Sequence, residues 1–478
     1  MEAITHSLRN LFTISLVVLL SKAAGHAAVL DGFVRDESSG SPLEGAIVQL
    51  PETGEKVSTN RRGYFRFDDL EAKPTAVQVR YLGAETKTLE VTPGDDADSL
   101  DVPMTLDVYE LTDFTVSAYQ SATARALNMQ RSSENLRDIV ASDLFGRFAD
   151  TNAAEALNRL PGVSVERDQG EGRFVVIRGI NPDLNSVALD GVTLAAPADD
   201  ERSTLLDTIP IEVLNTLEVT KAVTPDQPGD SIGGYINLKT PSAFDYEGRT
   251  TRLNGALLYS DLVDETGHRF NVFYADTFGE DEQWGFVLTA VNSERTFGSD
   301  NVEAAAWEEE GAGYVTEEIE YREYDLTRER TGFTANLEFQ PQPDSLFFVR
   351  GSYNNYQDVE TRDLSKSIFE DGSFSSVTGD SFTYDNTATE IELKEREENM
   401  RIFVASIGGE QTFEDWMVDY TLAFSEAEED TPFDREVVYA ADGASTTTVT
   451  DAGGYKPRLG PATPGTTDYS DPGVYELD

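Results

Sequence analysis

The sequence contains no cysteine and only three histidines. Without cysteine the chain can form no disulfide, no thiolate metal site and no cysteine nucleophile. His6 and His26 lie within the first 27 residues, so only His268 remains for a histidine metal site. We therefore expect no bound metal.

Basic residues are scarce, because 37 Lys and Arg stand against 88 Asp and Glu, a formal net charge of -51. Phosphate binding requires Lys and Arg to displace counterions, so nucleic acid is excluded as a partner. Paired acids carry little information about catalysis in a chain this acidic. No arrangement of side chains typical of an active site is present in the sequence, and we predict a protein that is not an enzyme and needs no cofactor.

Long apolar runs are also missing, since a membrane-spanning helix needs about 20 apolar residues. The run Leu11–Leu20 has 10 residues, follows Arg9 and precedes a segment rich in small residues that ends at Ala27. This pattern is typical of a secretory signal peptide covering 1–27, and an uncleaved anchor is the less favoured alternative. Any membrane crossing by the mature chain must then be made by β-strands.

Residues 125–241 alternate short strands with turns that contain Gly, Asn or Pro. The helical pattern AAEALNRL ends at Pro161-Gly162, which is a helix stop. Five ordered pieces, LNRLPGV, FVVIRGI, LDGV, IEVLNTLEVTKA and SIGGYINLKT, resemble the plug domain of TonB-dependent outer-membrane receptors. The resemblance implies active import of a nutrient across the outer membrane. The segment RGINPDLNSVALDGVTL is similar to the corresponding segment in a subgroup of these receptors that is linked with carbohydrate uptake.

The resemblance singles out several residues in the plug. Gly179, Gly191, Gly233 and Gly234 are expected to adopt positive φ or to allow close backbone approach. Arg178 and Lys221 are candidates to pair with carboxylates of the barrel or plug, with solvated surface charge as the alternative. The full set of motif residues is Pro161, Gly162, Arg178, Gly179, Asp190, Gly191, Glu218, Lys221, Gly233 and Gly234.

Residues 28–106 hold short β-forming runs between Gly and Pro turns, which predicts a small β-sandwich. The pieces LDGFVRDESSGSPLEGAIVQL, TNRRGYFRF and VRYLGAETKTLEV resemble the carboxypeptidase-regulatory-like domain, a module that often precedes such a plug. The resemblance implies no catalysis.

The linker 107–124 joins this front domain to the plug. An exposed extended segment can add a strand to a partner's sheet edge. In the resembled family this place holds the Ton box, which the periplasmic domain of TonB grips. A last strand of the front domain is the alternative. The candidate TonB-contacting residues are Glu110, Leu111, Thr112, Asp113, Phe114, Thr115, Val116, Ser117 and Ala118.

From residue 250 onward the sequence alternates with period 2 in pieces of about ten residues, the length of a transmembrane β-strand. In 331–339, for example, Phe333 and Leu337 oppose Thr334 and Asn336. A soluble sandwich is the alternative, but connections that alternate between short and long favour a barrel. Seven strands are expected at 251–261, 268–278, 284–292, 331–339, 345–355, 401–411 and 415–425.

The expected connections differ in length. Those at 279–283, 340–344 and 412–414 are short, as is 262–267. Long loops are expected at 293–324, at 356–400 and after 426. Residues 294–325 hold eleven acidic and two basic side chains, for which a solvated surface is favoured over a cation-attracting loop.

The predicted fold is mainly β with a small α/β plug: an N-terminal β-sandwich, a plug domain, and an incomplete transmembrane antiparallel β-barrel at 242–478. Plugged transporters have about 22 strands, so seven strands indicate a fragment. Expected partners are the TonB periplasmic domain, outer-membrane lipid and a small nutrient ligand, and a surface lipoprotein is left open. The expected location is the outer membrane, with the N-terminal domain in the periplasm. A siderophore or cobalamin receptor is one alternative, and a surface-signalling or adhesion protein is another.

Overall fold

The computed structural model describes residues 28–477 apart from several gaps. The predicted signal peptide, 1–27, lies outside the described residues. The gaps are 39, 95–98, 107–116, 134, 142–149, 198–201, 226, 247, 311–312, 343, 371, 414–415, 453, 455 and 462–470.

The front domain is the predicted β-sandwich. A three-stranded sheet in the order β4-β1-β7 and a four-stranded sheet in the order β3-β2-β5-β6 enclose an apolar core that includes Val34, Val48 and Phe65. Burial alternates strictly along β1, as period-2 patterning requires. The strands are β1 Ala28–Asp36, β2 Ile47–Gln49, β3 Lys56–Ser58, β4 Tyr64–Leu70, β5 Thr75–Arg80, β6 Lys87–Val91 and β7 Leu100–Met104.

The plug domain is built around a five-stranded sheet in the order β12-β11-β14-β13-β8, with a separate β9–β10 hairpin. Helix α2 (Ser117–Ser132) precedes this sheet, and its first residues, 117–124, are the end of the segment predicted as linker. The Asn152 side chain caps α3 by accepting from Glu155 N at 3.0 Å. The other elements are β8 Arg137–Ala141, α3 Ala153–Leu157, β9 Val163–Asp168, β10 Glu171–Ile177, η2 Pro182–Leu184, β11 Asn185–Leu189, β12 Val192–Thr193, η3 Leu206–Thr208, η4 Ile211–Val213, β13 Thr216–Thr220, β14 Gly234–Lys239 and η5 Ala243–Asp245.

A large antiparallel sheet follows, in the order β15-β16-β17-β18-β19-β21-β22-β23, and its described strands do not close into a ring. All seven predicted strands are confirmed, each matching one strand of this sheet, although Asp261 lies just beyond β15 and residue 415 is outside the described residues. The elements are β15 Thr250–Ser260, β16 Glu265–Phe278, η6 Glu280–Glu282, β17 Trp284–Glu310, β18 Gly313–Gln342, β19 Ser345–Ile368, β20 Ser373–Thr378, β21 Ser381–Phe413, β22 Trp416–Thr450, β23 Arg458–Pro461, η7 Pro472–Val474 and β24 Glu476–Leu477.

The predicted long loops are wrong. Residues 293–324 form most of a β17–β18 hairpin that stays in register from Trp284↔Phe339 to Glu310↔Gly313. The segments 356–400 and 426–450 are likewise mostly strand. The side chains of these extensions are largely polar, so the sequence lacks the apolar alternation on which the prediction depended. The extensions are strands nevertheless, because their backbones pair.

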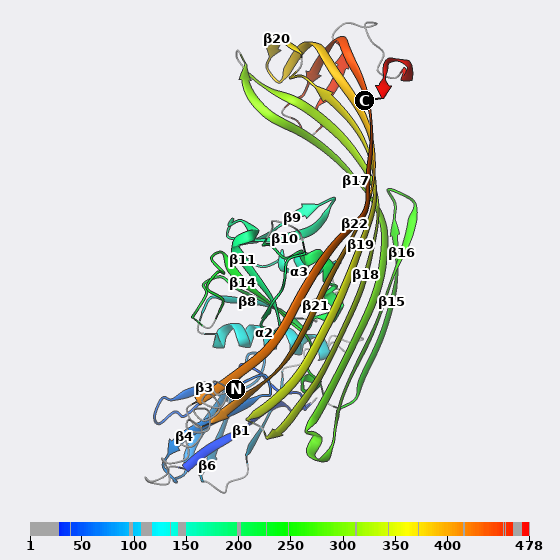
Figure 1. Cartoon of the computed structure of the whole chain (residues 1–478). Coiled ribbons are helices and arrows are strands. Elements are labelled where there is room, and N and C mark those ends of the chain that lie inside the picture. The colour runs from blue at the N-terminus through cyan, green and yellow to red at the C-terminus, as the bar shows by residue number, and fades with distance from the viewer. Residues whose placement is uncertain are drawn as a thin grey trace, which may run out of the picture.

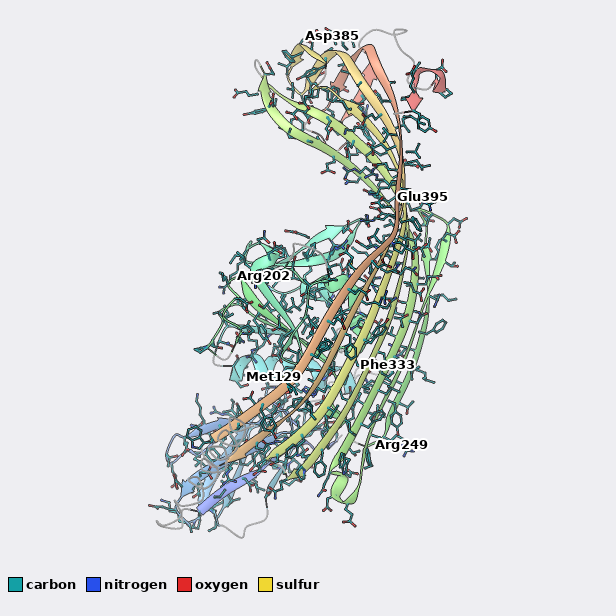
Figure 2. All side chains as sticks on the ribbon, viewed as in Figure 1. Met129, Arg202, Arg249, Phe333, Asp385 and Glu395 are labelled. Atoms are coloured by element: carbon teal, nitrogen blue, oxygen red, sulfur yellow. The ribbon has the colours of Figure 1, made fainter. Side chains whose placement is uncertain are left out.

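The sheet is a curved wall with two chemically different faces, and the plug lies on its concave side (Figure 1). Phe333 points away from the plug (Figure 2) and is exposed, whereas its neighbour Thr334 is buried beneath the plug. Near the end of the wall beside the front domain, four rings stack in a row: Phe278, Trp284, Phe339 and Phe347. This row matches the aromatic girdle of a membrane barrel. Among the described residues there is no helical segment that could serve as a membrane span.

Candidate functional site: the plug–wall interface

The tip of the β9–β10 hairpin reaches the wall (Figure 1), and Glu171 lies there at the start of β10. Its carboxylate is 3% exposed and meets three arginines of the wall. Arg295 Nη1 on β17 lies 2.5 Å from Glu171 Oε1. On β18, Arg328 Nη1 and Arg330 Nη2 lie 3.1 and 2.6 Å from Oε2. One plug carboxylate therefore ties two strands of the wall to the plug.

Electrostatics explain how Glu171 stays charged. Burial alone would raise its pKa, but the guanidinium groups of Arg330, Arg328 and Arg295 hold that pKa well below its usual range. The opposite holds at Asp207, whose complete burial raises its pKa even though Arg173 lies 3.8 Å away. Glu171 is thus the firmly ionised acid of this interface.

The same arginines have further partners on both sides of the interface. Arg328 Nη2 lies 3.0 Å from Asp358 Oδ2 on β19 of the wall, and Arg330 Nε donates to the carbonyl of Asp207 in η3 of the plug at 2.7 Å. Arg173 of the plug reaches Glu398 of β21 at 3.6 Å. Ion pairs therefore cross the interface in both directions.

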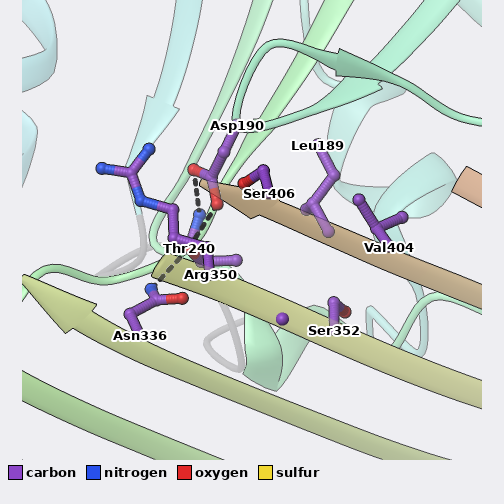
Figure 3. A pocket seen from close by; sticks show the side chains of 9 residues that line it. Leu189, Asp190, Thr240, Asn336, Arg350, Ser352, Val404 and Ser406 are labelled. Carbon is purple, nitrogen blue, oxygen red and sulfur yellow. Dashed lines mark hydrogen bonds between the residues drawn. The ribbon is translucent and has the colours of Figure 1, made fainter. Parts of the chain in front are cut away.

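A second polar contact lies nearer the front domain, at the end of β14 (Figure 3). Thr240 N and Oγ1 donate to Asp190 at 3.1 and 2.5 Å, and Asn336 Nδ2 of the wall donates to Thr240 Oγ1 at 2.8 Å. A cavity of about 10 Å³ lies beside them, lined also by Arg350 and Ser352. Asn336 Oδ1 has no protein hydrogen-bond partner among the described residues, and the space matches one water molecule.

The third contact joins the plug to the front domain through Asp245. Arg61 of the front domain approaches this carboxylate at 2.7 Å, and Arg125 of α2 at 3.4 Å. Arg61 also donates to the Thr240 carbonyl at 3.0 Å. Burial would raise the Asp245 pKa, but Arg61 and Arg125 lower it to about 2. The front domain is therefore tied to the junction between plug and wall.

The predicted charged motif residues pair within the plug. Arg178 is exposed and its Nη1 donates to the Lys221 carbonyl at 3.1 Å, and among the described residues it forms no ion pair with a carboxylate of the wall or of the plug. Lys221 forms an ion pair with Asp138 of β8 and donates to the Pro161 carbonyl. Glu218 is buried between Arg137 at 3.4 Å and Lys239 at 3.0 Å. These charges hold the plug sheet together.

The glycines fall into two groups. Gly162, Gly179 and Gly191 have positive φ values of 69°, 74° and 83°. A Cβ at Gly233 would lie 2.2 Å from Asn185 Oδ1, and one at Gly234 would lie 2.6 Å from Ile177 Cδ1. The expectation of positive φ or close approach at 179, 191, 233 and 234 thus agrees with the geometry.

Of the candidate TonB-contacting residues, Glu110–Val116 lie outside the described residues, and Ser117 and Ala118 begin α2. Sequence reasoning missed Glu171, Asp245 and the wall arginines. Their pairings join positions 120 to 184 residues apart, and no local pattern reports such contacts. Within the described residues no group of His, Asp and Glu could hold a metal ion.

Two family models match the chain. Residues 129–235 match the TonB-dependent receptor plug domain, and residues 29–105 match the carboxypeptidase regulatory-like domain. The predicted resemblances of these two segments are therefore confirmed.

Solved structures also align with the chain. The ferric citrate transporter FecA in its unliganded form is 14% identical, over 68% of this chain and 62% of that chain, with a TM-score of 0.33. The siderophore receptor PirA from Acinetobacter baumannii is 10% identical, over 68% and 62%, with a TM-score of 0.32. For the FpvAI–pyocin S2 complex the values are 10%, 84%, 60% and 0.36. The chain thus spans less than two thirds of the length of these proteins.

Proposed function

Because the chain carries a TonB-dependent receptor plug domain behind a carboxypeptidase regulatory-like domain, we propose that it imports a nutrient actively across the outer membrane. The observation that carries the proposal is the plug seated on the polar face of an amphipathic sheet. The opposite face, with Phe333, Leu337 and Trp416 exposed, is suited to lipid.

The composition of the interface suits a plug that must move. The plug has its own apolar core, to which the wall adds few side chains, among them Val291, Ile402 and Val404. Leu205 and Phe174 of the plug also pack against Tyr356 and Met400 of the wall. The polar contacts are ion pairs and hydrogen bonds such as those of Glu171 and Thr240. Water can replace each of these contacts as the plug moves, whereas an apolar core must be exposed at once.

Force is proposed to enter through the linker, where Glu110–Ala118 would pair with the periplasmic TonB domain by strand addition. Deleting 110–118 should leave binding of cargo at the cell surface unchanged and abolish energised uptake. A sharper variant is Leu111→Pro, which removes a backbone donor, with Leu111→Ile as its matched control. Normal uptake by the deletion variant would contradict this role.

The proposed cargo is a small nutrient. The amino-acid sequence of residues 178–194 favours a carbohydrate, and iron chelates and cobalamin are the alternatives. Uptake of labelled oligosaccharide, ferric chelate and cobalamin should be compared with and without a proton gradient. Import that depends on the gradient identifies the cargo. Surface binding without such import would favour an adhesion or signalling role instead.

A further inference from the structure

The wall arginines around Glu171 form a carboxylate-binding site that the plug itself occupies. The chain is strongly acidic, with a net charge of -51, yet Arg295, Arg328 and Arg330 converge here on one acid. Arg295 and Arg330 have Glu171 as their only ion-pair partner within 4 Å among the described residues. Removing the plug would leave both guanidiniums without an acid.

The plug contacts these arginines also through the Asp207 carbonyl and Gln169, but contacts within the wall orient all three guanidiniums. The Arg295 guanidinium lies over the ring of Phe297 at 4.2 Å, and that of Arg330 lies over Tyr356 at 5.0 Å. Arg328 is fixed by two hydrogen bonds to Asp358, at 3.0 and 3.1 Å. Stacking and pairing of this kind orient guanidiniums before an anion arrives.

The acidic residues of the wall do not neutralise the positive charge of this site. Asp358 is engaged by Arg328, and Glu360 lies 3.1 Å from Arg396 of β21. Both acids therefore keep a basic partner on the wall when the plug is absent. Glu398 loses Arg173 of the plug but keeps Arg396 at 4.0 Å. The two arginines freed by the plug have no acid of the described wall within 4 Å, so a local excess of positive charge remains at their guanidiniums.

We propose that the three arginines receive a carboxylate of the cargo once Glu171 has moved away, so that the imported nutrient is an anionic one. This inference rests on the proposed import function. At rest Glu171 occupies the site in the place of that carboxylate. Arg295 is 36% exposed, which gives the site an opening beside the hairpin. Bidentate guanidinium–carboxylate pairing accounts for the choice of ligand.

The test uses the intact protein in detergent micelles, with galacturonate as the probe and galactose as its uncharged match. Glu171→Ala should bind galacturonate at least about tenfold more tightly than the unaltered protein does, because the competing acid is gone. Galactose should show no gain. Adding Arg295→Gln and Arg330→Gln should abolish the gain, while Arg249→Gln, at an exposed pair with Asp276, should preserve it.

Two outcomes would overturn the proposal: no gain in Glu171→Ala, or a gain that survives loss of both arginines. Protease resistance of the plug, measured on each variant, separates unfolding from loss of the site. A further variant, Glu171→Gln, fills the space without charge and should show the same preference for galacturonate over galactose. Import that does not depend on the proton gradient would refute the proposed function but would leave this binding result unaffected.

Discussion

At the scale of single residues, Asp245 fastens three parts of the chain at one carboxylate. It meets Arg61 of the front domain and Arg125 of α2, and Asn215 Nδ2 of the plug donates to it at 3.1 Å. Its own backbone leads directly into β15 through the last turn of the plug. Loss of this charge should therefore loosen the front domain first.

We predict that Asp245→Asn weakens docking of the front domain by about 2–3 kcal/mol, because two guanidiniums lose their acid. Limited proteolysis of the intact protein at neutral pH should release the front domain faster. Asp276→Asn removes the acid of the exposed pair with Arg249 and should change the rate little. Equal effects of the two substitutions would contradict the assignment.

Asp245 also makes docking depend on pH. Its pKa falls from 3.8 to about 2 on folding. A lowered pKa stabilises the folded form above the unfolded value, by about 2 kcal/mol here, and this contribution is lost as the pH falls from about 4 through 2. Proteolytic release should rise across that window in the unaltered protein and be flatter in Asp245→Asn.

At the scale of elements, we expect the outward face of β18 to set the position of the wall in lipid. Phe333 lies six residues from Phe339 in the aromatic row, about 20 Å along the strand. With a strand tilt of about 40° this places Phe333 near the middle of the bilayer. Ile391 has the same outward orientation, but it lies much farther along the wall, opposite Ser365.

We predict that Phe333→Arg destabilises the membrane-inserted protein by about 2–4 kcal/mol, since a charge at the midplane must leave water. Ile391→Arg should cost almost nothing. Urea unfolding in lipid vesicles measures both values. Similar costs at the two positions would show that the aromatic row does not mark the lipid boundary.

Sequence reasoning located the elements better than their ends. Alternation of apolar and polar residues found 331–339 because one face meets an apolar medium. In the run Thr389–Asn399 only Ile391 and Leu393 are apolar, and backbone pairing with β19 and β22 makes it a strand. The motif glycines could be predicted because turns and close approaches are local. Glu171 could not, since its partners are distant in sequence.

At the scale of the whole molecule, the wall extends far past any bilayer. The strand β22 has 35 residues, about 120 Å if fully extended, whereas a membrane crossing needs about ten. The aromatic row lies near the front domain, so most of this excess is at the opposite end, beyond Glu395 toward Asp385 (Figure 2). The extension should therefore stand outside the cell.

We predict that an epitope inserted at the Gly379–Asp380 turn is labelled by antibody on intact cells. The same epitope in the turn Glu280–Glu282 should be labelled only after the outer membrane is permeabilised. Both sites are exposed turns between paired strands, so neither insertion should disturb the sheet. Reversed labelling would invert the proposed orientation.

The position of β8 at the border of the plug sheet has a mechanical consequence. This strand comes first after α2 and has one neighbour, β13, to which five residue pairs hold it. Tension arriving through α2 would load the Arg125–Asp245 pair and the β8–β13 seam before it reaches the other four strands of the sheet. We therefore expect the plug to yield in part, opening a passage without leaving the wall.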